Sequence, residues 1–262
     1  MKPFFQAIAV ASMVISHSVM ARNLPDIIRS SSLRVGTTGD YAPLTRCDSL
    51  GHCEGFAIDM AKSLGNYLSQ ITGKTISVEF VKTNWPDLHS DLANDRFDVA
   101  MGGITRTDDR SQHFLVSDNV IPSGKVLLMQ QSKADAYLGM NDHQLTKHLN
   151  ISNLHLVINP GGTNQRFVRK HLPDMRVTLT ADNREPFLML QQHQADAMIT
   201  DRTEALYQVK QIPSLMIVND AMFSWTVSHK IFMTQKSSLL LMSEVNRWLK
   251  QTDIQSIQKK WF

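Results

Sequence analysis

The segment Phe97-Asp-Val-Ala-Met101, followed directly by Gly102-Gly103, decides the fold, because it ends a series of strand-like and helix-like stretches. Its short apolar run is typical of a buried strand that ends at Met101 and runs into the two glycines. The stretches before it alternate in type: a strand at 33–38, a helix at 56–67, a strand at 77–81, and a helix at 86–93 with proline in its first turn. This order predicts a mostly parallel sheet with helices on both faces.

The same alternation begins again in the second half of the chain. Strands are expected at 154–159, 176–179 and 197–200, and helices at 163–172, 186–193 and 204–211. Two such units predict an α/β protein of two lobes, with a ligand cleft between them beyond the carboxyl ends of the strands. We expect lobe 1 at residues 22–122 and lobe 2 at 123–222. Residues 223–262 then return to lobe 1 through a strand near Ile231 and a helix at 238–250.

The N-terminus has the features of a secretory signal peptide. Lys2 precedes a mostly apolar segment at 4–19, and Val19-Met20-Ala21 is similar to a signal-peptidase site. We therefore predict a signal peptide at residues 1–21, removed on export, and a mature protein in the periplasm. The alternative is an uncleaved membrane anchor, but several polar residues interrupt the apolar segment: Gln6, Ser12, Ser16, His17 and Ser18.

The charges of the chain nearly balance. There are 27 Lys and Arg against 24 Asp and Glu, which gives a formal net charge of +3, and the basic residues are scattered. This pattern does not indicate a nucleic acid or a membrane surface as a partner. The oligomeric state stays open.

Cys47 and Cys53 are the two cysteines of the chain, and they flank a short turn. In an oxidising compartment such a pair closes a hairpin loop with a disulfide. The alternatives are two free thiols or half of a metal site. No second Cys or His pair at ligand spacing follows, so a disulfide is favoured and no metal is expected.

The run Asn159-Pro-Gly-Gly-Thr-Asn164 lies between an expected strand and an expected helix. Its glycines let the backbone approach a ligand, and free N–H groups at a helix start attract an anion. It matches neither a phosphate-binding P-loop nor the dinucleotide fingerprint, so a carboxylate is the better ligand. The alternative is an ordinary turn with Thr163 as the N-cap.

Two arginines follow the strand that ends at Met101. Arg106 and Arg110 come just after Thr105, and arginine binds a carboxylate through two parallel hydrogen bonds. The sequence does not show which of the two arginines binds a ligand. The alternative is that both are solvated charges on the surface.

Asp201 and Glu204 are three residues apart at the start of an expected helix. That spacing is typical of an N-capping Asp with a capping-box Glu, which is a structural arrangement. The functional alternative places Glu204 in the cleft, where burial and the neighbouring carboxylate raise its pKa. Glu204 would then keep a proton near neutral pH and act as a general acid.

Residues 55–61, 97–105 and 195–201 are similar to shared segments of the family-3 extracellular solute-binding proteins, the amino-acid receptors of ABC importers. Residues 34–41, 84–88, 159–164 and 200–205 more closely resemble an enzymatic branch of that family, the periplasmic cyclohexadienyl dehydratases. The resemblance covers about the whole mature chain, and Asn159-Pro-Gly-Gly-Thr-Asn164 is its most specific segment.

The resemblance implies a type II periplasmic-binding-protein fold with a cleft between two lobes. It also implies conversion of prephenate or arogenate to an aromatic product, without metal or organic cofactor. The main alternative is a transport receptor that binds an amino acid and carries out no chemistry. Two segments depart from the pattern: 42–44, where an aromatic residue usually follows Tyr41, and 118–120 before the first crossover.

Carried over by position, the resemblance implies a role for eleven residues. Glu204 matches the general acid, with Asn159 and Trp85 as further catalytic residues of the pocket. Arg110 would hold a substrate carboxylate, helped by Thr105, Gly162 and Thr163. The other substrate contacts would come from Asp40, Gly103, Lys125 and Asp201, and Asp201 matches the acid with which binding proteins hold an amino group.

Overall fold

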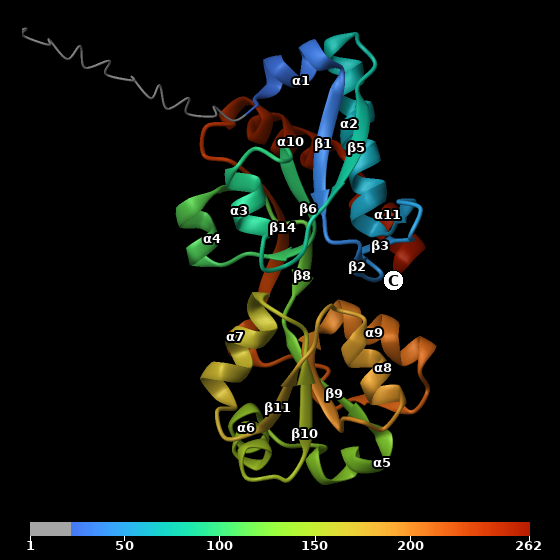
Figure 1. Ribbon diagram of the computed structural model, residues 1–262, viewed down its shortest axis with the longest axis vertical. Helices are drawn as coiled ribbons and strands as arrows, with labels where there is room; N and C mark the ends of the chain where they lie inside the picture. The colour runs from blue at the N-terminus through green and yellow to red at the C-terminus, as the bar shows by residue number, and fades with distance from the viewer. Residues whose placement is uncertain (1–21) are drawn as a thin grey trace, which may run out of the picture.

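The computed structural model describes residues 22–262, which form two lobes, each with its own sheet and helices (Figure 1). The predicted two-lobed α/β architecture is therefore confirmed. The signal peptide predicted for residues 1–21 lies outside the described residues. Within residues 22–262, no helix combines the length and the apolar character needed to span a membrane.

The sheet of lobe 1 has the strand order β5-β1-β6-β14-β7, and β8 also pairs with β14. β1 is parallel to β5 and β6, as the alternation of strands and helices predicts, whereas β14 is antiparallel to β6 because it arrives from lobe 2. The strands are β1 (Ser32–Thr37), β5 (Ser77–Lys82), β6 (Val99–Thr105), β7 (Leu115–Val116), β8 (Ile121–Ser123) and β14 (Ser228–Thr234).

Helices pack around this sheet, and α2 buries one apolar face against it. Met60, Leu64 and Leu68 recur at helical spacing on α2, and they join Val35 of β1 and Trp248 of α10 in one core. The helices are α1 (Leu24–Ser30), α2 (Phe56–Thr72), α3 (Leu88–Ala93), α4 (Asp108–His113), α10 (Leu239–Gln251) and α11 (Ile254–Trp261).

Lobe 2 repeats the plan with the strand order β11-β10-β12-β9-β13. β10 is parallel to β11 and β12, and β9, which enters from lobe 1, is antiparallel to β12. The strands are β9 (Lys125–Gln130), β10 (His155–Ile158), β11 (Arg176–Leu179), β12 (Ala197–Asp201) and β13 (Leu215–Ile217). The helices are α5 (Gln131–Ala134), α6 (Asp142–Asn150), α7 (Gly162–His171), α8 (Glu185–Gln191) and α9 (Arg202–Gln211).

A small third sheet lies on lobe 1 and consists of β2 (Asp40–Tyr41), β3 (Thr45–Cys47) and β4 (Cys53–Glu54). Cys47 and Cys53 pair across β3 and β4 and form a disulfide. The predicted disulfide is thus confirmed, and it closes the hairpin loop between these strands.

Two adjacent segments connect the lobes. The chain leaves lobe 1 from β8 into β9 and returns to β14 after β13. Ser123 pairs with Ser228, and the amide of Phe223 donates to the carbonyl of Lys125 at 2.8 Å, so the two segments run side by side. Paired crossing segments of this kind are the arrangement expected of a hinge between two rigid bodies.

Several element boundaries differ from the predictions. The predicted helix at 86–93 begins only at Leu88, and Pro86 lies in the preceding turn. β6 continues through Gly102 and Gly103, which adopt φ angles of 139° and 88°. A Cβ atom at Gly103 would lie 2.5 Å from the ring of Tyr41, so this strand stays intact where another side chain approaches its backbone.

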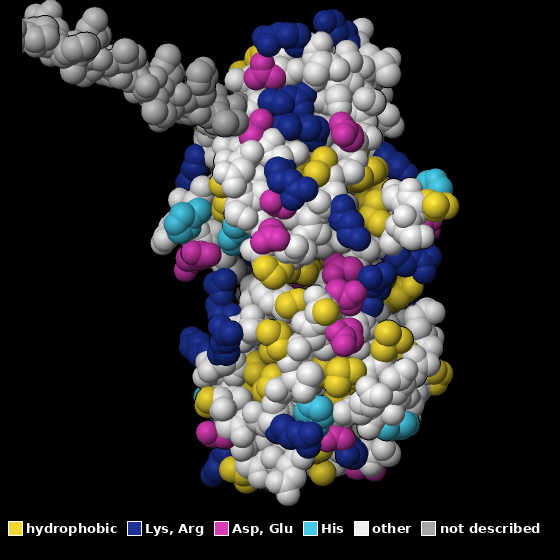
Figure 2. Space-filling model, viewed as in Figure 1, with side chains coloured by type: hydrophobic (Ala, Val, Ile, Leu, Met, Phe, Trp, Pro, Cys, Tyr) yellow, Lys and Arg dark blue, Asp and Glu magenta, His cyan; other side chains and the backbone are white. Residues whose placement is uncertain are grey.

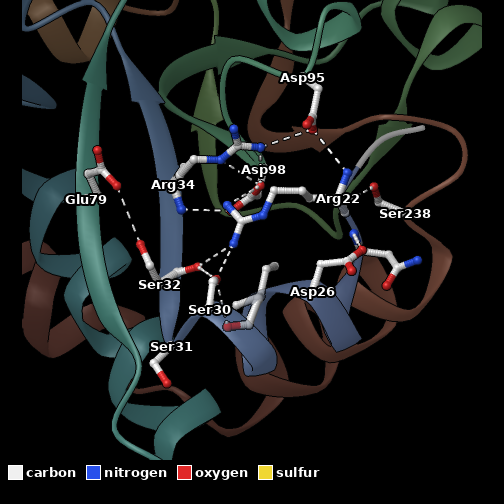
Figure 3. A network of polar contacts seen from close by, with 12 residues as sticks. Arg22, Asp26, Ser30, Ser31, Ser32, Arg34, Glu79, Asp95, Asp98 and Ser238 are labelled. Atoms are coloured by element: carbon white, nitrogen blue, oxygen red, sulfur yellow. Dashed lines mark hydrogen bonds and ion pairs between the residues drawn. The ribbon is translucent and has the colours of Figure 1, made fainter. Parts of the chain in front are cut away.

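A polar network fastens the start of the described chain to lobe 1 (Figure 3). Asp98, whose side chain is fully buried, accepts hydrogen bonds from Arg34 at 2.7 Å and from Arg22 at 3.1 Å. The backbone amide of Arg22 donates to Asp95 at 3.1 Å. All of these residues belong to lobe 1, so the network holds one lobe together.

Candidate functional site

A small cavity lies between the lobes, where strands of both sheets end. Its volume is about 20 Å³, room for roughly one water molecule. Residues of lobe 1 line one side (Tyr41, Trp85, Gly103, Thr105 and Arg110), and residues of lobe 2 line the other (Asn159, Gly162, Thr163, Asn164 and Asp201). Eight of the eleven residues implicated by the sequence lie on this surface, and Asp40, Lys125 and Glu204 do not.

Asp201 is the centre of an ion network across the cleft. It ends β12, is buried, and accepts from Lys125 at 2.7 Å, from Lys230 at 2.6 Å and from the hydroxyl of Tyr41. Burial alone would raise the pKa of Asp201, but the two lysines hold that pKa well below its usual range. Asp201 also occupies the N-cap position of α9, yet its side chain makes no capping hydrogen bond. The capping alternative is therefore wrong for Asp201.

Lys230 of β14 is a buried residue that the sequence analysis missed. Its ammonium group donates to Asp201, to the carbonyl of Gly103 at 2.8 Å and to the hydroxyl of Thr105 at 3.0 Å. Burial lowers the pKa of Lys230 to about 8, so it still carries its charge at neutral pH. A signal was present, since a lysine directly before the apolar run Ile231-Phe-Met233 is unusual in a buried strand.

Glu204 lies in the first turn of α9 with 1% of its surface exposed. Burial is the main cause of a pKa well above the usual value for a Glu, and the neighbouring Asp201 raises it further. The hydroxyl of Thr200 donates to its carboxyl group, and α9 shows no capping box. Glu204 is thus neither solvated nor bonded to its own helix's amides, although it lies outside the lining of the small cavity.

The structure separates Arg106 from Arg110. Arg106 donates to Asn119 at 3.1 Å and to the carbonyl of Ser117, so its guanidinium is used within lobe 1. Arg110 is 4% exposed, lines the cavity, and donates to the carbonyl of Thr105 at 2.6 Å. Burial lowers its pKa to about 10, which leaves it charged at neutral pH. Arg110 is therefore the arginine available to an anion in the cleft.

The turn before α7 presents polar groups to the cavity. Gly161 is the N-cap residue and α7 begins at Gly162, so the alternative of Thr163 as an N-cap is wrong. Instead, the hydroxyl of Thr163 accepts from Lys125 at 2.6 Å. Asn164, which had no predicted role, also accepts from Lys125 and donates to Asn159 at 2.7 Å. This chain of contacts orients the side chains at the lobe 2 face of the cavity.

The model of the family "Bacterial extracellular solute-binding proteins, family 3" matches residues 33–262. The chain belongs to this family. This solute-binding protein is 34% identical over 216 residues to a cyclohexadienyl dehydratase of Pseudomonas aeruginosa. The matched region covers 82% of this chain and 76% of that protein. It is 22% identical to an L-cystine-binding protein of Escherichia coli, over 88% of this chain and 82% of the relative.

Solved structures place the fold in the same group. An ancestral amino-acid-binding protein, described as a precursor of cyclohexadienyl dehydratase, superposes with a TM-score of 0.79 at 30% identity, covering 91% of this chain and 98% of that one. ArgBP from T. maritima, at 22% identity, superposes with a TM-score of 0.77 and the same coverage. The type II periplasmic-binding-protein fold is therefore confirmed, and small molecules such as amino acids are the ligands of this family.

Asp40 of this solute-binding protein does not line the small cavity but contacts the opposite lobe. Its carboxylate accepts from the amide of Asn183 at 3.2 Å and from the side chain of Asn183 at 3.1 Å. Since Asp40 belongs to lobe 1 and Asn183 to lobe 2, the pair connects the lobes directly.

A wider groove of about 510 Å³ opens beside the cavity, and Thr105 and Thr163 line both, whereas Lys125 lines the groove alone. Arg166 and Lys170 of α7 line it, and Figure 2 shows Lys and Arg side chains gathered at this side of the junction between the lobes. A basic approach raises the local concentration of an anion. No cluster of three or more His, Cys, Asp or Glu suited to a metal ion occurs in the part of the chain that the structure describes.

Proposed function

We propose that this protein is a cyclohexadienyl dehydratase, which removes carbon dioxide and water from prephenate or arogenate in the cleft between its lobes. One observation carries the proposal: Glu204 is a buried carboxyl group beside the cleft whose pKa is raised well above its usual value. A carboxylic acid that keeps its proton at neutral pH is what general-acid catalysis needs. The 34% identity to a protein named cyclohexadienyl dehydratase supports the same reading.

The charges at the site suit a substrate with more than one carboxylate. Arg110, Lys125 and Lys230 are cationic, and Asp201 is their buried anionic partner. With Glu204 protonated, the site keeps an excess of positive charge that a bound dianion would neutralise. Prephenate carries two carboxylates, and Arg110 is placed to hold one of them.

In the proposed reaction, Glu204 gives its proton to the ring hydroxyl as the bond from ring carbon to oxygen breaks, so that water leaves. The bond between the ring and its carboxylate also breaks, and that electron pair enters the ring while carbon dioxide departs. The ring becomes aromatic, which supplies the driving force. Solvent then returns a proton to the Glu204 carboxylate, and the product is phenylpyruvate from prephenate or phenylalanine from arogenate.

Substrate entry requires the lobes to separate. A cavity of about 20 Å³ is far smaller than a substituted six-membered ring, and the contacts of Tyr41 and Lys230 with Asp201 bridge the lobes. Opening at the two crossing segments would admit the substrate, and closure would exclude water and strengthen the charge contacts. Closure around the ring would also have to bring the leaving hydroxyl to Glu204.

The first prediction concerns Glu204→Gln, which keeps the shape of the side chain and removes the acidic proton. We expect the turnover of prephenate, followed by the appearance of phenylpyruvate, to fall by about 10²–10⁴-fold, the usual contribution of one placed acid. The melting temperature should show that the variant stays folded. Glu79→Gln, an exposed change on lobe 1, is the matched control and should keep full turnover.

The pH profile adds a second readout to this experiment. Because the acid form of Glu204 is the active one, wild-type kcat should fall as the pH rises through the raised pKa of Glu204. The residual rate of Glu204→Gln should lack that decline. Unchanged turnover in Glu204→Gln would contradict the proposal. So would an inactive wild type that binds a free amino acid tightly, and that result would indicate a receptor.

A further inference from the structure

The ammonium group of Lys230 fills a cage of three acceptors. The acceptors are the carbonyl of Gly103 at 2.8 Å, the hydroxyl of Thr105 at 3.0 Å and the carboxylate of Asp201 at 2.6 Å. An ammonium group has three N–H donors and no acceptor, so each donor is satisfied. Two of the acceptors belong to β6 of lobe 1, and the carboxylate belongs to β12 of lobe 2.

The α-ammonium group of an amino acid has the same charge and the same three donors as this lysine. These three acceptors, a carbonyl, a hydroxyl and a carboxylate, would therefore suit the ammonium group of an amino-acid ligand if Lys230 did not occupy the position. It is not open, because Lys230 is anchored in β14 and is itself only 3% exposed. Expelling it would leave a buried cation without its partners, which is costly.

The carboxylate of Asp201 has no acceptor site left for a second ammonium group. Its Oδ1 atom accepts from Lys125 at 2.7 Å and from Ser123 at 3.4 Å. Its Oδ2 atom accepts from Lys230 and from the hydroxyl of Tyr41. Each oxygen thus already has two donors, as many as its lone pairs provide for.

The donors that face the cavity suit an acceptor group on the ligand. The indole Nε1 of Trp85 is buried without a partner among residues 22–262, and Trp85 lines the cavity. An indole N–H only donates, so it can satisfy a keto or carboxylate oxygen and cannot satisfy an ammonium group. Arg110, also on the cavity surface, has the same preference.

We propose that Lys230 determines specificity by occupying the ammonium position, so that the site takes a 2-keto acid in preference to the corresponding 2-amino acid. Resting on the proposed function, this selects prephenate over arogenate as the substrate. The lysine excludes the amino compound in two ways, since it fills the acceptor cage and repels a second cation at close range.

The test compares two ligands that differ only in this group, phenylpyruvate and L-phenylalanine, by isothermal titration calorimetry. We expect the wild type to bind phenylpyruvate at least tenfold more tightly. Lys230→Met keeps a long side chain and removes the ammonium group from the cage of acceptors. The ratio of the affinities for phenylpyruvate and L-phenylalanine should therefore drop at least tenfold. Lys236→Met, which removes an exposed lysine just beyond the same strand, is the matched control and should keep the preference.

The wild-type comparison remains decisive even if Lys230→Met does not fold. Equal or tighter binding of L-phenylalanine by the wild type overturns the inference, and so does a folded Lys230→Met that keeps the wild-type preference. Turnover separates the two proposals. Similar kcat/KM for prephenate and arogenate would uphold the dehydratase and overturn the role of Lys230. A keto preference that Lys230→Met abolishes, with turnover of neither substrate, would support the specificity role and overturn the enzyme.

Discussion

Asp98 and Asp201 are two buried carboxylates with the same number of cationic partners and different consequences. Asp98 binds Arg22 and Arg34, and all three residues lie in lobe 1 (Figure 3). Asp201 binds Lys125 of its own lobe and Lys230 of the opposite lobe. The first network ties together parts of one rigid body, whereas the second joins two bodies that must separate.

The chemistry of the partners matches these tasks. Arg34 meets Asp98 through its Nε and Nη2 atoms and its own backbone amide, a planar geometry that fixes the carboxylate. Lysine is a compact charge on a flexible chain, and it holds a carboxylate without demanding one orientation. Burial raises the pKa of Asp98, while the two lysines hold the pKa of Asp201 below its usual range. The lysines therefore more than offset the cost of burying the charge of Asp201, so their pairing across the lobes should stabilise closure. Arg22 and Arg34 offset only part of the cost of burying Asp98, so removing a partner leaves buried charge within lobe 1.

The largest effect should come from Asp201→Asn, which breaks the network between the lobes. Two buried lysines would lose their anionic partner, at a cost of about 3 kcal/mol, or roughly a hundredfold in the ratio of closed to open protein. We expect a larger radius of gyration in small-angle X-ray scattering and a loss of prephenate turnover. A compact, fully active Asp201→Asn would contradict the assignment of this network to closure.

Asp98→Asn should have the next largest effect, and on a different property. Arg22 and Arg34 are each 21% exposed in their side chains and can be partly rehydrated, so we expect a loss of about 2 kcal/mol in the free energy of unfolding. Urea unfolding measures this change. Turnover per folded molecule and the radius of gyration should match the wild type, and a change in either would erase the contrast with Asp201.

The smallest effect should come from Arg22→Gln, which sharpens the comparison within lobe 1. Arg34 still neutralises Asp98 in this variant, so the loss should be about 1 kcal/mol in urea unfolding. A loss as large as that of Asp98→Asn would mean that Arg22, and not Arg34, is the main partner of the buried carboxylate.

Periodicity predicted the order of the main strands and helices, because most of them bury apolar residues that the sequence displays, although Val177 and Leu179 of β11 are exposed. Helix starts were less accurate: Pro86 suggested a first turn, yet α3 begins at Leu88. The glycines of β6 were expected to end a strand, but their positive φ angles let it continue past the ring of Tyr41. Such close approaches depend on a distant partner and leave no local pattern.

The site was less predictable, since its contacts cross between lobes. Lys230 and Asp201 are 29 residues apart and come from different sheets, so no spacing relates them. Arg106 and Arg110 have the same chemistry, and only the partners of Arg106 in lobe 1 distinguish them. The spacing of Asp201 and Glu204 fits both a helix cap and a pair of site residues. The hydrogen bond from Thr200 to Glu204 shows that Glu204 does not cap its helix. The catalytic and specificity roles of these residues stay predictions.

The contact between Asp40 of lobe 1 and Asn183 of lobe 2 has a consequence for the binding of any ligand. The protein draws its halves together with its own side chains, so an incoming molecule competes with those contacts before it gains any of its own. The apparent affinity is then the intrinsic affinity of the open form multiplied by the fraction of molecules that are open. A protein that its own side chains hold closed should therefore show a weak apparent affinity even for its proper ligand.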